Sequence, residues 1–136
     1  MSLVDKLMAI DKGSFAIDKT EQVPAKHLSE VLGEQVEVTI KALTGDQYTD
    51  ITTRLMDRKG NMDFSRTYDI NALLVVAAVV DPVLSDKDLQ KHFGAATPKD
   101  LAKILFPGAE LTALANRITE LSGFTGEDEE TAEVKN

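Results

Sequence analysis

The longest unbroken apolar run in the sequence, Ala72–Val80, most constrains the fold. It holds two Leu, four Val and three Ala, and the first charge after it is Asp81. Burying its six larger side chains contributes roughly 9–18 kcal/mol as an upper bound. A domain of this size is stable by only about 5–15 kcal/mol in total. We therefore expect the core to be built around this run.

The run fits a helix better than a strand. Four valines would suit a strand, but a strand that is apolar on both faces belongs in a parallel sheet covered on both sides, and the sequence holds no second such run. The apolar residues at helical positions i, i+3, i+4 and i+7 are Ile70, Leu73, Leu74 and Ala77. Pro82 disfavours helix at the residue before it. We predict a central helix over residues 67–80, buried nearly all round and too short in apolar residues to span a membrane.

Composition narrows the class of protein. A chain of 136 residues is one domain, and the absence of Cys excludes disulfides and thiolate metal sites and fits a reducing cytosol. Asp5 and Lys6 interrupt any signal-peptide core, so we expect none. A net charge of −8 and the lack of Trp argue against nucleic acid or an anionic membrane as the main partner.

Charge also predicts the domain boundary. Residues 125–136 carry −4, which is half of the net charge, and have no apolar periodicity. We expect this acidic tail to be disordered, and residues 1–124 to form a single globular domain.

The N-terminal third gives mixed signals. Residues 2–10 have the spacing of a short amphipathic helix, residues 15–17 suggest a brief extended segment, and residues 18–23 read as a polar loop. Pro24 could open a helix to Leu32 that ends at Gly33, or the same residues could pair as the first arm of a hairpin.

Alternating apolar and polar residues predict one clear strand in this region. In Val36–Ala42 every second residue is apolar. A lone strand is not stable, so we expect a partner strand within residues 14–30.

Helix-capping signals organise the remainder of the chain. Thr44 is a candidate cap for a helix to about Asp57, followed by a turn at residues 59–61. Residues 85–88 and 97–100 resemble capping boxes that open helices, the first closing at Gly94. A last helix runs from about residue 109 to 122 and ends at Gly123. The inward set of the first of these helices is predicted to be Tyr48, Ile51 and Leu55. The apolar members of the later helices are Leu84, Leu89, Phe93, Leu101, Ile104, Leu105, Leu111, Leu114, Ala115, Ile118 and Leu121.

These elements predict a mainly helical α+β fold. We expect a compact bundle of about five to six short helices around the buried central helix at about 67–80. One short antiparallel hairpin lies in the N-terminal third.

The order of the motifs resembles a known family. The segments that carry the likeness are, in order, Lys41–Thr44, Leu73–Pro82, Leu89–Gly94, Thr97–Leu101, Gly108–Leu111 and Ile118–Phe124. With these segments, the chain is similar to the XkdN-like tail assembly chaperones of phages and prophages of Gram-positive bacteria over about residues 20–124, most strongly after residue 72.

The resemblance implies a non-enzymatic assembly factor without cofactors. Such chaperones coat the tape-measure protein in the host cytoplasm, keep it soluble while tail-tube subunits polymerise around it, and are absent from the mature virion. In many relatives a ribosomal frameshift appends a domain that recruits the tail-tube protein, and the acidic tail would then be the junction. We also expect self-association into a homo-oligomer. The alternatives are a small phage adaptor or connector retained in the virion, and a small enzyme or nucleic-acid regulator.

Residues whose side chains could take part in catalysis or metal binding form no convincing catalytic, cofactor or metal site in the sequence. His27 and His92 are interpreted as surface or half-buried side chains. Asp86 and Asp88 are interpreted as first-turn charges of a helix. Asp57, Asn61 and Asp63 match the pattern of a calcium-binding loop only in part. The partner-binding residues stay unknown at this point. Two sets of residues allow either a structural interpretation, as solvated surface or core, or a role in binding a partner. They are the basic cluster Arg54, Arg58, Lys59 and Arg66, and the aromatic set Phe93, Phe106 and Phe124.

Overall fold

The computed structural model describes residues 2–15 and 19–124. Seven α-helices and a small three-stranded antiparallel sheet make up this part of the chain, which confirms the mainly helical α+β class. The helices are α1 (Leu3–Met8), α2 (Lys26–Leu32), α3 (Gly45–Thr52), α4 (Thr67–Ala78), α5 (Lys87–His92), α6 (Pro98–Leu105) and α7 (Ala109–Leu121). The strands are β1 (Thr20–Pro24), β2 (Glu37–Lys41) and β3 (Val79–Asp81), in the order β1-β2-β3.

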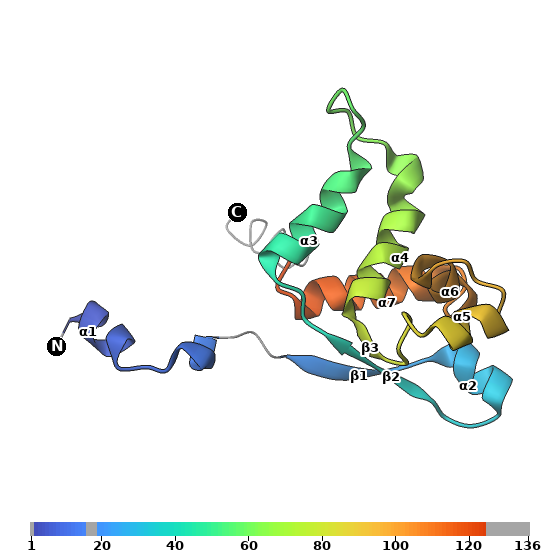
Figure 1. The fold of residues 1–136 in the computed structure, drawn as a ribbon, viewed down its shortest axis with the longest axis horizontal. Coiled ribbons are helices and arrows are strands. Elements are labelled where there is room, and N and C mark those ends of the chain that lie inside the picture. The colour runs from blue at the N-terminus through green and yellow to red at the C-terminus, as the bar shows by residue number, and fades with distance from the viewer. Residues whose placement is uncertain (1, 16–18, 125–136) are drawn as a thin grey trace, which may run out of the picture.

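Helix α4 is the central element, as the sequence predicts. It packs against α6 and α7 and meets α3 along its other side (Figure 1). Its buried residues are Ile70, Ala72, Leu74, Val75 and Ala78. Leu73, Val76 and Ala77 are half-buried against the same core, so the helix is covered on most of its surface.

The predicted end of this helix at residue 80 is wrong. The helix stops at Ala78, and Val79 starts β3, whose residues pair with β2 through Ile40↔Val79 and Thr39↔Asp81. Two β-branched valines before Asp81-Pro82 suit a strand, and the open edge of β2 offers them backbone partners. A third strand therefore replaces the last half-turn of the predicted helix.

The pairing of β1 with β2 confirms a partner for the clear strand within residues 14–30. The register places Val23 opposite Val38 and Glu21 opposite Ile40. The two strands pair antiparallel in the N-terminal third, as the predicted short hairpin requires, and α2 forms the connection between them. The prediction of a loop at residues 18–23 is wrong from residue 20 onward, where β1 begins.

Polar β1 is held by partners that lie far away in sequence. Its Glu21 forms an ion pair with Arg117 of α7, and Arg117 also pairs with Glu120 at 2.8 Å. The hydrogen bonds from Arg117 lower the pKa of the Glu21 carboxyl. Sequence periodicity cannot show such long-range pairing, which explains why residues 20–23 were expected to be loop.

Helix α2 begins two residues later than predicted and has an unusual cap. Pro24 ends β1 rather than opening the helix, and the cap residue, Ala25, has no side-chain acceptor. Glu110 at the start of α7 supplies the acceptor instead, with its carboxylate 2.8 Å from the Lys26 amide nitrogen and 3.2 Å from that of His27. Gly33 ends the helix in the left-handed region, as predicted. The Glu110 carboxylate at the positive, N-terminal end of α2 therefore links α7 to α2.

Other capping predictions hold with small shifts. Thr44 and Thr97 cap α3 and α6 as expected. The cap of α5 is Asp86 rather than Ser85, because the Asp86 side chain accepts from the Leu89 amide. Helix α3 ends at Thr52 and a 3₁₀ turn continues to Leu55, so the helix is shorter than predicted.

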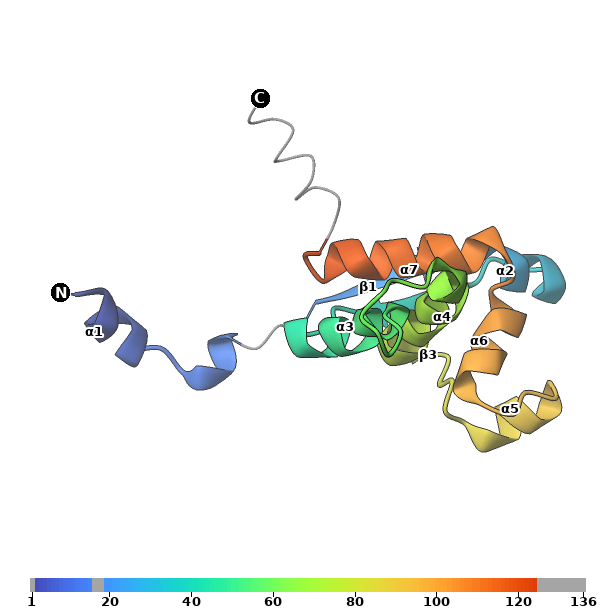
Figure 2. The same ribbon diagram turned by 90° about the horizontal axis from the view of Figure 1, so that it is seen from above.

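The N-terminal helix stands apart from the body (Figures 1 and 2). It spans Leu3–Met8, shorter than the predicted 2–10, and Ser2 caps it. A 3₁₀ turn at Lys12–Phe15 replaces the predicted extended segment there, while Ile17 lies outside the described residues. The predicted disordered tail at 125–136 also lies outside them and stays a prediction, as does the single domain over 1–124.

The core fills the space between the sheet, α4, α6 and α7. Of the apolar helix residues named from sequence, Leu101, Leu111 and Ile118 are fully buried. Ile104 and Phe93 are instead 40% and 44% exposed. None of the helices among residues 2–15 and 19–124 is long and apolar enough to cross a membrane.

Candidate partner-binding surfaces

A turn between α3 and α4 projects from the body and forms the first candidate surface (Figure 1). The turn at residues 59–61 is confirmed, and Gly60 adopts a positive φ of 84° that favours glycine there. Met56 and Met62 face each other across an isolated antiparallel bridge that flanks this turn. Met56, Met62 and Phe64 are 44%, 49% and 71% exposed, and we call these three residues the tip.

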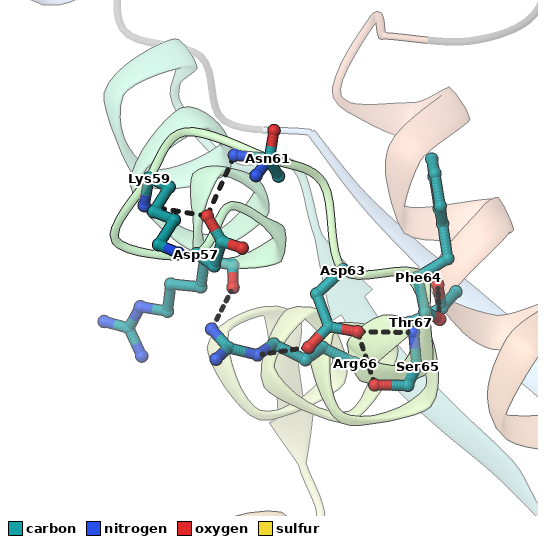
Figure 3. Close-up of polar contacts among 9 residues, drawn as sticks. Asp57, Lys59, Asn61, Asp63, Phe64, Ser65, Arg66 and Thr67 are labelled. Carbon is teal, nitrogen blue, oxygen red and sulfur yellow. Dashed lines mark hydrogen bonds and ion pairs between the residues drawn. The ribbon is translucent and has the colours of Figure 1, made fainter.

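Backbone and side-chain hydrogen bonds join the residues of the turn (Figure 3). The Asp57 carboxylate accepts from the amides of Lys59 and Asn61 at 2.8 and 2.9 Å. The Asp57 amide donates to the Asn61 carbonyl at 2.7 Å, and the Asp63 amide donates to the Leu55 carbonyl at 2.6 Å. Asp57 and Asp63, which the sequence suggested as part of an incomplete calcium-binding loop, therefore stabilise the turn itself.

The second carboxylate of the turn fixes the start of α4. Asp63 accepts from the Ser65 amide at 3.1 Å and pairs with Arg66 at 3.3 Å. Hydrogen bonds from Ser65, with the charge of Arg66, lower the pKa of the Asp63 carboxyl. Arg66 also donates to the Arg54 carbonyl at 3.1 Å, which joins the two sides of the turn (Figure 3).

The basic cluster predicted around this turn is thus partly structural. Arg54 pairs with Asp50 at 3.5 Å and Arg66 with Asp63, whereas Arg58 and Lys59 are exposed beside the tip. The three apolar side chains of the tip were missed by sequence reasoning. Their signal was the placement of Met56 and Met62 on both sides of a predicted turn, where apolar residues have no core to reach.

The second candidate surface is an apolar groove of about 260 Å³ at the far end of the body from α1. Helices α2, α5 and α6 supply its walls. The lining residues are His27, Leu28, Val31, Leu32, Pro82, Leu89, Phe93, Ile104 and Leu105. Val31 and Leu32 are 66% and 61% exposed, so the groove presents apolar surface to solvent. Sequence could not reveal it, because its three helices come together only in the folded chain.

The aromatic set divides among three roles. Phe106 is fully buried in the core, Phe93 lines the groove, and Phe124 stacks on Tyr48 of α3 with ring centroids 4.4 Å apart. His92 contacts the Phe93 ring edge-on at 5.0 Å between centroids, and His27 lies in the groove wall. Asp86 caps α5 and Asp88 lies in its first turn. The described residues hold no group of three or more His, Asp or Glu side chains placed to bind a metal ion.

Comparisons with known proteins identify the family. Residues 4–135 match the family described as phage XkdN-like tail assembly chaperone protein, so the chain belongs to that family. A crystal structure titled as that of the protein YqbN is similar in fold, with a TM-score of 0.63 and 23% identity, over 84% of this chain and 92% of that chain. A search of curated proteins found no match. The family indicates a non-catalytic role in tail assembly, with protein partners.

Proposed function

We propose that this chain binds the tape-measure protein in the host cytoplasm and keeps it soluble while the tail tube assembles. Membership of the tail assembly chaperone family carries this proposal. A chaperone of this kind needs exposed apolar surface on a folded support, and it works by binding rather than by catalysis. The net charge of −8 helps keep a complex with an apolar partner in solution.

We assign the tip as the surface that holds the partner. Met56 and Met62 pair across the bridge that flanks the projecting turn, Phe64 follows Met62 by two residues, and all three side chains are exposed. Methionine side chains adapt to varied apolar partners, while Asp57 and Asp63 accept hydrogen bonds that stabilise the backbone of the turn. Such a surface suits a long partner that offers many similar apolar segments rather than one unique epitope.

Co-expression with a tape-measure segment tests both statements. We expect the wild-type chain to raise the soluble fraction of the segment severalfold, and the double variant Met62→Glu/Phe64→Glu to remove most of this gain. Two charges would replace the apolar contact without disturbing buried residues. The readout is the amount of segment in the soluble fraction by quantitative immunoblotting.

Two controls separate the outcomes. Asn116→Glu adds a charge on the exposed side of α7 and should leave the gain unchanged. A gain no larger than that given by an unrelated acidic protein contradicts the chaperone function. A full gain with the double variant contradicts only the assignment to the tip.

The assembled particle offers a second check. A chaperone that leaves before tail assembly is complete should be missing from purified virions, or tail-like particles, of the phage or prophage that encodes it. We expect mass spectrometry to detect the tail-tube and tape-measure proteins but not this chain. Detection at a fixed copy number per particle would favour a structural adaptor instead.

A further inference from the structure

Helix α1 exposes apolar side chains that its own body does not cover. None of its residues is buried, and Leu3, Val4 and Met8 are 69%, 66% and 81% exposed. Its polar side chains bond within the helix, where Ser2 and Asp5 form a reciprocal cap. A six-residue helix is marginal in water by itself, so this segment gains stability only by docking its apolar side chains.

The groove between α2, α5 and α6 has the complementary character. It is an exposed apolar channel whose most accessible members are Val31, Leu32, Phe93 and Ile104. Laying an amphipathic helix into an apolar groove is a recurrent recognition mode. The chain therefore carries both halves of such a contact.

The two halves lie at opposite ends of the molecule. Both views place α1 beyond the start of β1, whereas α2, α5 and α6 lie at the other end (Figures 1 and 2). A second copy in antiparallel orientation brings its groove to the first copy's α1 and its α1 to the first copy's groove. A two-fold axis makes the two contacts identical, as in most homodimers.

We infer that two copies form a dimer in which each α1 occupies the groove of the other. This inference goes beyond the proposed function and uses none of the tip residues. The occupant is a second copy rather than another protein, because the apolar helix and the groove belong to the same chain and their positions permit reciprocal exchange.

The buried area favours exchange in both directions. A buried aliphatic side chain removes about 100 Å² from water, and the exposed apolar residues of α1 and the groove are roughly half accessible. Complete burial of these side chains in one contact would remove at most roughly 500 Å² of apolar surface, or roughly 900 Å² in total, because interfaces are slightly more than half apolar. One such contact falls below the range of about 1,200–2,000 Å² typical of stable complexes, whereas two reach it.

Sedimentation and light scattering of the full chain and two variants test the dimer. We expect the wild type to be a dimer, and both deletion of residues 1–12 and Ile104→Glu to give folded monomers. The deletion removes only exposed residues of the described part, and Ile104 is 40% exposed, so neither change should unfold the body. Val80→Glu is the matched control, since Val80 is 41% exposed but lies outside the groove, and it should remain dimeric.

Mixing the two monomeric variants gives the decisive result. The deletion variant keeps a groove and the Ile104→Glu variant keeps α1, so one intact contact should form between them. We expect a one-to-one heterodimer, weaker than the wild-type dimer, although neither variant pairs with itself. A monomeric wild type, a dimeric deletion variant, or no heterodimer at concentrations up to the millimolar range would overturn the inference. The co-expression assay is independent of these variants, because they leave the tip unchanged.

Discussion

Replacing Val75 by Asp is expected to abolish the native fold. Val75 lies in the middle of α4 with no accessible surface, where α4 packs against α6 and α7. A buried carboxylate without a partner costs several kcal/mol, which is comparable to the whole net stability of about 5–15 kcal/mol. Circular dichroism and urea unfolding should show loss of the cooperative transition, or an insoluble product.

Val83→Asp is the matched control for this substitution. The residue type and the introduced charge are the same, but Val83 is 55% exposed. We expect its free energy of unfolding to stay within about 0.5 kcal/mol of the wild type. A Val75→Asp protein with a normal unfolding midpoint would show that α4 is not the centre of the core.

Phe106→Ala is expected to cost about 3–5 kcal/mol of stability. Phe106 ends α6 and is fully buried, and it borders a small cavity of about 90 Å³ together with Val23, Val38 and Leu114. Removing its ring enlarges a void that the sheet and α7 already leave open. Urea unfolding at constant slope should show the midpoint falling by the corresponding amount.

Phe93→Ala separates this effect from the general loss of an aromatic ring. Phe93 is 44% exposed in the groove, so its truncation should cost only about 1 kcal/mol. Equal losses for the two variants would contradict the assignment of Phe106 to the core and Phe93 to the surface.

Local signals predicted the parts of the fold that local interactions build. The central helix, the strand at residues 37–41 and the caps at Thr44 and Thr97 follow from periodicity and capping chemistry within a few residues. A partner strand within residues 14–30 was predicted, but its position at Thr20–Pro24 was missed because its polar residues are held by β2 and by Arg117. Strand β3 was missed because Val79 is equally suited to helix or strand until β2 offers it a partner.

The candidate surfaces were less accessible to prediction. The turn and its basic residues were visible in sequence, but not the exposure of Met56, Met62 and Phe64, which depends on how far the turn projects from the body. Ile104 and Phe93 have the spacing of core residues, yet they line an open groove. Periodicity reports which face of a helix is apolar but not what covers that face.

The most direct test of the account is a dilution experiment with the purified chain and a tape-measure segment. The segment is diluted from denaturant into buffer, and aggregation is followed by light scattering. We predict that a stoichiometric amount of the wild-type chain suppresses scattering and co-elutes with the segment, while Met62→Glu/Phe64→Glu does neither. Scattering as strong with the wild-type chain as with an unrelated acidic protein would contradict the claim that this chain holds another polypeptide in solution.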